Sequence, residues 1–284
     1  MKVIDYFYNC GTTELEDRFE LLVNREAYMS VEYSRMFKDK LNSIKLEGKI
    51  AFLYAGGVGI HNSEGRNYQG KESYSQPILK DGLVIKDLQA YMMHKYIGML
   101  VKNGNNITYA NINSNTCASS LYSIYEAERL LRDDIVDYVV VVAEEKTSFN
   151  TIRIFKEHQI DVKPGEGFAC IVLGKEKDGI QIMESKWEYS YSTNPFLVSA
   201  EGYSKVSTLA KEVKGHKTGT KQNDEAEAAV FGSTFGYKDK IGHCQGASGL
   251  IEICMVLDED SKTNVLCLAS GLGGFYGSCL VNKE

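Results

Sequence analysis

The 284-residue sequence has only three prolines, one tryptophan and no low-complexity tract. Proline-rich and low-complexity segments often mark linkers, so their scarcity gives no sign of a domain boundary. The sequence also has no apolar run of about 20 residues, the length that spans a bilayer. Its N-terminal residues lack an apolar stretch of signal-peptide length. We therefore expect a single domain, residues 1–284, in the cytoplasm and without a membrane span.

The chain also has fewer basic than acidic residues: 32 lysines and arginines against 38 aspartates and glutamates, for a net charge of −6. The chain has no basic run or aromatic–basic stripe of the kind that binds nucleic acid. Its seven cysteines are an odd number, scattered without a CxxC pair, and no two Cys or His positions show metal-ligand spacing. This pattern indicates reduced thiols in a cytoplasm. We expect no metal, no cofactor and no nucleic-acid partner.

Short apolar runs rich in β-branched residues alternate with helical patterns along the chain. They predict helices over 83–101 and 122–131, and strands over 49–55, 107–112, 137–143, 168–173, 180–184, 264–270 and 277–281. Continuous apolar strands that alternate with helices are typical of a sheet covered on both faces. The pattern therefore predicts the α/β class.

A glycine-rich segment, Ala55-Gly-Gly-Val-Gly59, follows a predicted strand and suggests a dinucleotide-binding loop. That fingerprint requires another glycine three residues after Gly59, where this chain has Asn62. No convincing second strand places the acidic residue that would bind the ribose. The nucleotide hypothesis is therefore disfavoured.

Cys117 directly precedes a helical pattern and follows a predicted strand. The helix is predicted from apolar residues on one face, namely Leu121, Ile124, Ala127 and Leu131. The positive end of a helix dipole lowers the pKa of a thiol, and the thiolate is the nucleophile. Cys117 is therefore a candidate nucleophile in a strand–turn–helix elbow. The alternative is a buried cysteine that acts as a small apolar residue.

Two histidines lie downstream among small residues. His216 stands in Gly215-His-Lys-Thr-Gly-Thr220, and His243 in Gly242-His-Cys-Gln-Gly-Ala-Ser-Gly249. A lone histidine is more often structural than catalytic. Two histidines close to turns, with small neighbours that leave room for a substrate, indicate a site.

In these segments the chain resembles the β-ketoacyl synthase family, the elongating condensing enzymes of the thiolase superfamily. Thr116–Ser120 is similar to the nucleophile motif, His216–Thr220 to the first histidine motif, and Lys238–Gly249 to the second. Pro164–Gly167 resembles the Gly-Glu-Gly turn, and Ser270–Gly274 the C-terminal glycine loop. Because the five segments follow the family order, the resemblance is specific. The chain would be an unusually short member.

The resemblance implies a thiolase-like fold, in which two related α/β halves stack as alternating helix and sheet layers (αβαβα). The N-terminal half would comprise about residues 1–174 and the C-terminal half about residues 175–284.

The resemblance also implies a carrier-protein-dependent condensing enzyme of specialised fatty-acid or polyketide biosynthesis. Cys117 would accept an acyl group, and a malonyl-type thioester would lose carbon dioxide and attack it in a decarboxylative Claisen condensation. His216 and His243 would donate hydrogen bonds to the enolate oxygen. Lys238 and Glu252 would support the second histidine. Their alternative interpretation is a solvated surface pair.

The backbone N–H groups of Cys117 and Leu272 would form the oxyanion hole by the same resemblance. The positions that it assigns to substrate binding are Thr218, Thr220, Gly273 and Gly274. Some residues depart from the family pattern: Lys217 replaces a glycine, and Leu272 replaces the gating phenylalanine. Non-elongating acyl transfer therefore stays open.

Two alternative functions remain. One is an acyltransferase that moves the acyl group from Cys117 to an amine, an alcohol or water. The other is a non-catalytic scaffold subunit of a ketosynthase heterodimer, which the retained cysteine and histidines disfavour. The expected partners are acyl carrier protein thioesters. Because a shortened chain closes less of its own acyl pocket, we expect a homodimer or a heterodimer with a longer ketosynthase.

Overall fold

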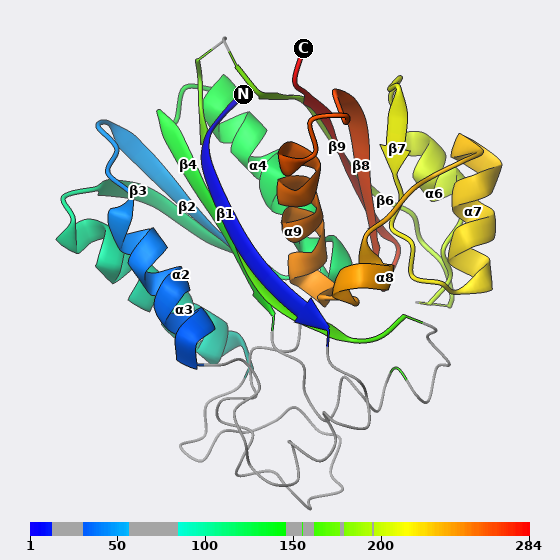
Figure 1. The fold of residues 1–284 in the computed structure, drawn as a ribbon, viewed down its shortest axis with the longest axis horizontal. Helices are drawn as coiled ribbons and strands as arrows, with labels where there is room; N and C mark the ends of the chain where they lie inside the picture. The colour runs from blue at the N-terminus through cyan, green and yellow to red at the C-terminus, as the bar shows by residue number, and fades with distance from the viewer. Residues whose placement is uncertain (13–30, 57–84, 146–154, 156–161, 177–178, 195) are drawn as a thin grey trace, which may run out of the picture.

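A computed structural model describes residues 1–12, 31–56, 85–145, 155, 162–176, 179–194 and 196–284 (Figure 1). The strands are β1 (Lys2–Thr12), β2 (Lys49–Gly56), β3 (Asn106–Asn113), β4 (Tyr138–Glu145), β5 (Gly165–Gly174), β6 (Gln181–Tyr189), β7 (Glu212–Lys214), β8 (Asn264–Gly271) and β9 (Phe275–Asn282). The helices are α2 (Val31–Ser43), α3 (Ile85–Lys102), the 3₁₀ helix η3 (Thr116–Ala118), α4 (Ser119–Arg132), α6 (Ala200–Lys205), α7 (Lys221–Phe231), α8 (Lys238–Ile241) and α9 (Gln245–Asp258). Gly57, Gly59 and Asn62, on which the nucleotide hypothesis depended, lie outside the described residues.

The strands form a nine-stranded mixed sheet in the order β3-β2-β4-β5-β1-β6-β9-β8-β7. In the N-terminal half, β1 pairs antiparallel with β5, β5 antiparallel with β4, and β4 parallel with β2. The C-terminal half repeats this scheme: β6 pairs antiparallel with β9, β9 antiparallel with β8, and β8 parallel with β7. The two halves meet where Lys2 of β1 pairs with Gln181 of β6. Their pairing schemes therefore match, and β3 extends the N-terminal half by one strand.

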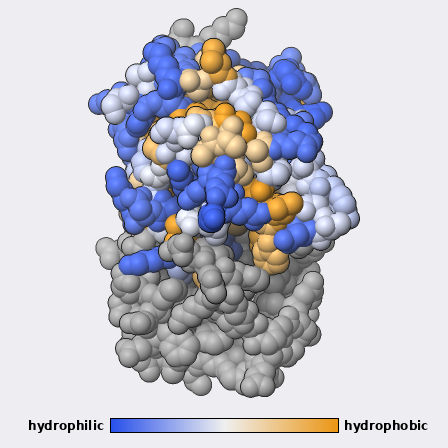
Figure 2. Space-filling model, turned by 90° about the vertical axis from the view of Figure 1, so that its right-hand side faces the viewer, coloured by the Kyte–Doolittle hydropathy of each residue, from blue (hydrophilic) through white to orange (hydrophobic). Residues whose placement is uncertain are grey.

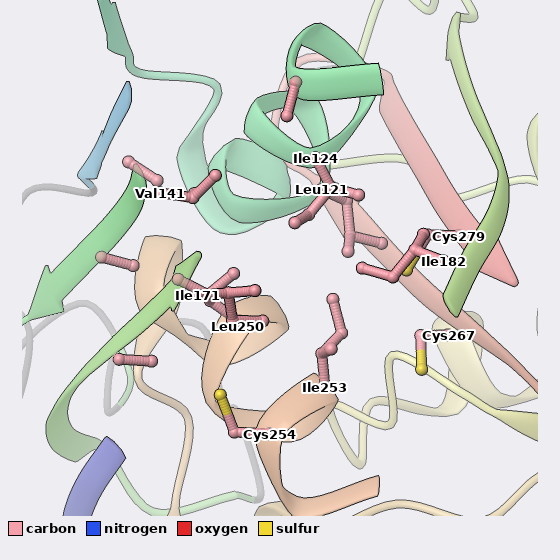
Figure 3. Close-up of a cluster of buried hydrophobic side chains, with 14 of the residues drawn as sticks. Leu121, Ile124, Val141, Ile171, Ile182, Leu250, Ile253, Cys254, Cys267 and Cys279 are labelled. Atoms are coloured by element: carbon pink, nitrogen blue, oxygen red, sulfur yellow. The ribbon is translucent and has the colours of Figure 1, made fainter. Parts of the chain in front are cut away.

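Helices cover both faces of each half of the sheet. Helices α4 and α9 lie between the two halves (Figure 1), where Leu121 and Ile124 of α4 approach Leu250 and Ile253 of α9 (Figure 3). A second apolar core packs α2 and α3 on the outer face of the N-terminal half. A third packs α6 and α7 on the outer face of β8 and β9. The layers therefore run helix, sheet, helix, sheet, helix, as the αβαβα expectation requires.

The apolar strands divide their side chains between two of these cores. In β2, Leu53 points into the central core, while Phe52 and Tyr54 point into the outer one. Successive residues of a strand face opposite sides of the sheet, so a strand buried on both faces must be apolar throughout. Each fully buried large apolar side chain contributes about 1.5–3 kcal/mol to this arrangement.

Small residues let α4 and α9 approach closely. The Ser120 hydroxyl of α4 donates a hydrogen bond to the Gly246 carbonyl oxygen of α9. A Cβ at Gly249 would lie 3.1 Å from the Cβ of Ser120, so larger side chains would push the helices apart. The first turns of the two helices follow Cys117 and His243 respectively. Their contact therefore brings the two residues together.

The surface over α6 and α7 is predominantly hydrophilic, with hydrophobic residues gathered in patches (Figure 2). Among the described helices, none has both the length and the apolar character needed to cross a bilayer.

Candidate active site

Cys117 lies in a sharp turn between β3 and α4. Thr116 has a φ of +52°, in the left-handed region that a threonine rarely adopts. The Ser119 hydroxyl stabilises the turn, because it accepts a hydrogen bond from the Asn115 N–H at 2.8 Å and donates one to the Thr116 carbonyl at 2.6 Å. Strained strand-to-helix turns of this kind present a nucleophile at the edge of a sheet.

The prediction that a helix N-terminus lowers the pKa of the Cys117 thiol is wrong. Helix α4 begins two residues after Cys117, at Ser119. Burial raises the pKa of Cys117 to about 12, and the Glu145 carboxylate adds to this, whereas the Lys238 ammonium lowers it. Burial dominates because a low-dielectric site disfavours the charged thiolate. Burial therefore favours the neutral thiol, and a base beside it would assist formation of the thiolate.

His243 is placed to be that base. Its Nε2 lies 3.2 Å from Cys117 Sγ, and its Nδ1 lies 3.1 Å from the hydroxyl oxygen of Ser248 on α9. The ring of Phe155 packs on the imidazole with centroids 5.9 Å apart. Both ring nitrogens thus have a partner, and the hydroxyl of Ser248 can donate or accept as the tautomer requires.

The backbone around His243 is held by the start of β5. The His243 N–H donates to the Lys163 carbonyl at 2.7 Å, and the Gly165 N–H donates to the His243 carbonyl at 3.2 Å. Gly242 has a φ of +71°, and a Cβ there would lie 2.9 Å from the backbone nitrogen of Gly165. Two motifs that lie far apart in the sequence therefore meet here, which explains why the glycines are needed.

His216 follows β7 and completes the cluster. Its ring is 5.3 Å from that of His243, centroid to centroid, and nearly perpendicular to it. The thiol sulfur of Cys117 and one imidazole nitrogen from each histidine lie within 4.8 Å of one another. Burial lowers the pKa of each histidine well below 6.5, and the nearby Lys238 ammonium lowers it further. The imidazoles are therefore neutral, and His216 Nδ1 has no hydrogen-bond partner among the described residues.

Lys238 and Glu252 lie directly behind the histidines. The Lys238 ammonium donates to Glu252 Oε1 at 3.0 Å and to the His216 carbonyl oxygen. Both side chains are 1% exposed, so they are not a solvated surface pair. Glu252 Oε2 accepts a second ammonium, that of Lys214.

The loop between β8 and β9 closes on the Cys117 turn. The Thr116 hydroxyl donates to the Leu272 carbonyl at 3.4 Å. A Cβ at Gly271 would lie 2.4 Å from Thr116 Oγ1, so this approach requires glycine. Gly273 and Gly274 continue the loop with φ values of +94° and +88°.

The two predicted substrate threonines follow His216 on the approach to α7. Thr218 and Thr220 are half-buried, and their hydroxyl oxygens lie 3.0 Å apart.

Four residues at the site were not selected from the sequence. Ser248 lies within the second histidine motif, and Lys214 stands two residues before His216. Both could have been found by asking which polar residues share a motif with a histidine. Glu145 at the end of β4 and Phe155 carry no such local signal.

The Cys117, His216 and His243 donors are a sulfur and nitrogen set of the kind that binds zinc. The buried ammonium groups of Lys214 and Lys238 oppose a further cation at this position. We therefore retain the prediction that the site holds no metal.

Neither a protein-family model nor a curated protein matches this sequence. Solved structures do match. The ketosynthase from module 6 of the bacillaene synthase of Bacillus subtilis 168 superposes with a TM-score of 0.67 at 14% identity, covering 99% of this chain and 71% of that one. The ketosynthase ApeO in complex with its chain length factor ApeC, from Xenorhabdus doucetiae, gives 0.63 at 14% identity over 99% and 97%. The complex AntDE:AntF, a type II polyketide synthase acyl-carrier protein with its ketosynthase, gives 0.66 at 14% identity over 97% and 92%. The predicted thiolase-like ketosynthase fold is therefore confirmed.

Proposed function

We propose that this chain is a ketosynthase-like condensing enzyme that forms an acyl-Cys117 intermediate and extends it with a malonyl-type thioester. The observation that carries the proposal is the 3.2 Å contact between Cys117 Sγ and His243 Nε2, with His216 beside it. The fold is one that ketosynthases share. A scaffold subunit would not need a thiol, a base and a second imidazole in contact.

Acyl loading begins with the protonated thiol. With its proton on Nδ1, directed at Ser248, His243 accepts the Cys117 proton at Nε2. The sulfur attacks the thioester carbonyl of the carrier-bound acyl group, the carrier thiolate leaves, and it takes the proton from His243. The oxyanion would be stabilised by the backbone N–H groups of Cys117 and Leu272, whose segments are in contact.

Condensation requires the histidines as donors. When a malonyl thioester loses carbon dioxide, negative charge builds on its thioester oxygen. His216 and His243 are neutral and buried, so each can donate one N–H without the desolvation cost of an imidazolium. For His243 the Ser248 hydroxyl then donates to Nδ1, which leaves the proton on Nε2. The enolate carbon attacks the acyl carbonyl, and the released Cys117 thiolate takes a proton from solvent.

The proposed substrates are acyl and malonyl thioesters of an acyl carrier protein, in a specialised fatty-acid or polyketide pathway of the cytoplasm. We further propose a dimer, with a second copy or with a longer ketosynthase. Strand β3 supports this assignment, since it ends the sheet and leaves one edge without a neighbouring strand among the described residues. Solved relatives of this fold include a ketosynthase bound to a chain length factor and one bound to an acyl carrier protein.

The decisive experiment is intact-protein mass spectrometry after incubation with acyl-carrier and then malonyl-carrier thioesters. We expect an acyl adduct on Cys117, its absence in Cys117→Ala, and its loss from wild type with release of a β-ketoacyl carrier. Cys10→Ala is the matched control, because Cys10 is the other half-buried cysteine.

Two outcomes separate the alternatives. Loss of the adduct to an amine, an alcohol or water, without a β-ketoacyl product, would select the acyltransferase. An adduct on another cysteine, or none, would contradict the proposal. Activity that requires a second ketosynthase chain and is unchanged by Cys117→Ala in this one would select the scaffold subunit.

A further inference from the structure

Lys214 is a fully buried ammonium group that the proposed chemistry does not use. It ends strand β7, two residues before His216, and its side chain is 0% exposed. Its ammonium donates hydrogen bonds to Glu252 Oε2 and, at 2.9 Å, to the Leu268 carbonyl of β8. A lysine is almost never fully buried unless it is paired. Its position behind a catalytic cluster therefore calls for a role.

Glu252 is shared between two ammonium groups. Its Oε1 accepts from Lys238 at 3.0 Å, and its Oε2 accepts from Lys214. One negative charge thus faces two positive charges in a site that excludes water. Within this triad Lys238 is neutralised only in part, because the carboxylate also balances Lys214. The remaining charge acts on the groups near Lys238, where low dielectric strengthens it.

The other groups near Lys214 do not replace Glu252. Glu227 of α7 and Cys267 of β8 also influence Lys214 electrostatically. The carboxylate of Glu227, however, is occupied by its own donors, namely the backbone N–H of Lys217, the Asn223 amide and the hydroxyls of Tyr203 and Thr234. The hydrogen-bonded partner of Lys214 among charged groups is therefore Glu252.

We propose that Lys214 is a positioning residue of this site: it shares Glu252 with Lys238 and thereby directs part of the Lys238 charge at Cys117 and the two histidines. Its part in catalysis rests on the proposed condensing function. The geometry gives Lys238 a second task, since its ammonium also contacts the His216 carbonyl. Without Lys214 the Glu252 carboxylate is free to turn wholly towards Lys238. This weakens both the field of Lys238 at Cys117 and the histidines and its contact with the His216 carbonyl.

The directions of the pKa shifts agree with this arrangement. Burial alone would lower the pKa of Lys214, but the Glu252 carboxylate raises it above the ordinary lysine value. Burial lowers the pKa of Lys238 despite the same carboxylate, and Lys214 lowers it further. Lys214 is also among the groups that keep the two imidazoles neutral.

The test is the pH dependence of Cys117 alkylation by iodoacetamide in the free protein, followed by mass spectrometry. Lys214→Gln keeps N–H donors but removes the charge, and Lys214→Met removes both. We expect both variants to shift the alkylation profile to higher pH. Positive charge near Cys117 stabilises the thiolate and disfavours the imidazolium forms, and both variants reduce that charge. Lys262→Gln is the matched control: it breaks the ion pair that Lys262, in the turn before β8, forms with Glu212 of β7, and it lies outside the triad.

A second comparison isolates the route through Glu252. In a Glu252→Gln background, Lys214→Gln should produce a clearly smaller shift than in wild type, since the route through Glu252 is already lost and only the direct field of Lys214 on the histidines is left. An unshifted profile for Lys214→Gln in the otherwise wild-type protein, with only a lower melting temperature, would overturn the proposal. So would an additive shift in the double variant. If Lys214→Met does not fold, Lys214→Gln decides alone.

The catalytic consequence is measured separately. We expect Lys214→Gln to slow decarboxylation of a malonyl carrier thioester about tenfold, because less positive charge at the site stabilises the developing enolate less. An unchanged decarboxylation rate would contradict the catalytic part. If wild-type protein neither loads nor decarboxylates, the condensing function fails, while the alkylation profile still tests Lys214.

Discussion

Replacing Glu252 by glutamine should destabilise the protein strongly, because one carboxylate balances two buried ammonium groups. Both Lys214 and Lys238 are at most 1% exposed at the side chain, and both donate to Glu252. Removing one partner of a buried pair costs about 3–5 kcal/mol, since the charge left behind is neither solvated nor paired. With an unfolding entropy of roughly 2.1 cal/mol/K per residue, this loss lowers Tm by about 5–8 °C in a chain of 284 residues.

The assay is thermal and urea unfolding of wild type and Glu252→Gln at low and high salt. The loss should persist in 1 M salt at roughly the same size, because a buried pair is screened little. The exposed pair Glu201–Lys205, with 2.9 Å between its charged atoms, provides the control. Glu201→Gln should change the free energy of unfolding by less than about 0.5 kcal/mol.

Replacing all three charged residues by apolar ones shows whether Glu252→Gln loses stability because two buried ammonium groups are left unpaired or because a packing contact is lost. The triple variant Lys214→Met, Lys238→Met, Glu252→Leu should regain most of the stability, because apolar groups of similar volume carry no desolvation cost. A Glu252→Gln variant with a Tm within 2 °C of wild type would refute this reasoning, as would a triple variant less stable than the single one.

Three further outcomes follow from the site. Burial lowers the pKa of His216 and His243 well below 6.5, so below that pH the unfolded chain binds more protons than the native protein. The free energy of unfolding should therefore fall as pH drops from about 7 to about 5, and a His216→Gln, His243→Gln double variant should show a smaller slope in urea unfolding; equal slopes would contradict the shift. Ser248→Ala should slow carbon dioxide release about 3- to 10-fold, the worth of one neutral hydrogen bond, and an unchanged rate would rule out tautomer control. Light scattering at micromolar concentration should show a dimer, and a folded monomer with full condensing activity would disprove it.

The strands that are buried on both faces could be predicted from the sequence, because such burial leaves a continuous apolar run. Strands β4 and β5 are buried along almost their whole length and were predicted to within a few residues. Strands β1 and β7 were not predicted. Strand β1 is mostly half-buried and so has no continuous apolar run. The three residues of β7, Glu212–Lys214, are too short and too polar for a periodic signal. Its tertiary position explains that composition, since Lys214 reaches back to Glu252 on α9.

Cys117, His216 and His243 could be selected from the sequence for a different reason, namely that each lies in a motif with unusual backbone conformations. Gly242 and Gly271 stand where a Cβ would collide with a neighbouring segment. Such positions are visible in a sequence as glycines beside a reactive residue. The sequence does not tell which side chains pair with one another, so the Lys214–Glu252 contact and the Ser248–His243 contact emerged only in three dimensions.

The error over the Cys117 thiol shows what a local pattern omits. The helix argument considers a favourable dipole near the sulfur, but the desolvation of the thiolate depends on everything packed around it, including β4 and its Glu145. Burial raises the pKa of the thiol and lowers that of each imidazole, so it favours the neutral form of all three groups at rest. The fixed charges of the site, those of Lys214, Lys238 and Glu252, lie one layer behind. Negative charge on the reacting atoms therefore develops only in the transition state. A fixed ammonium then stabilises the transition state more than the resting state and lowers the activation barrier.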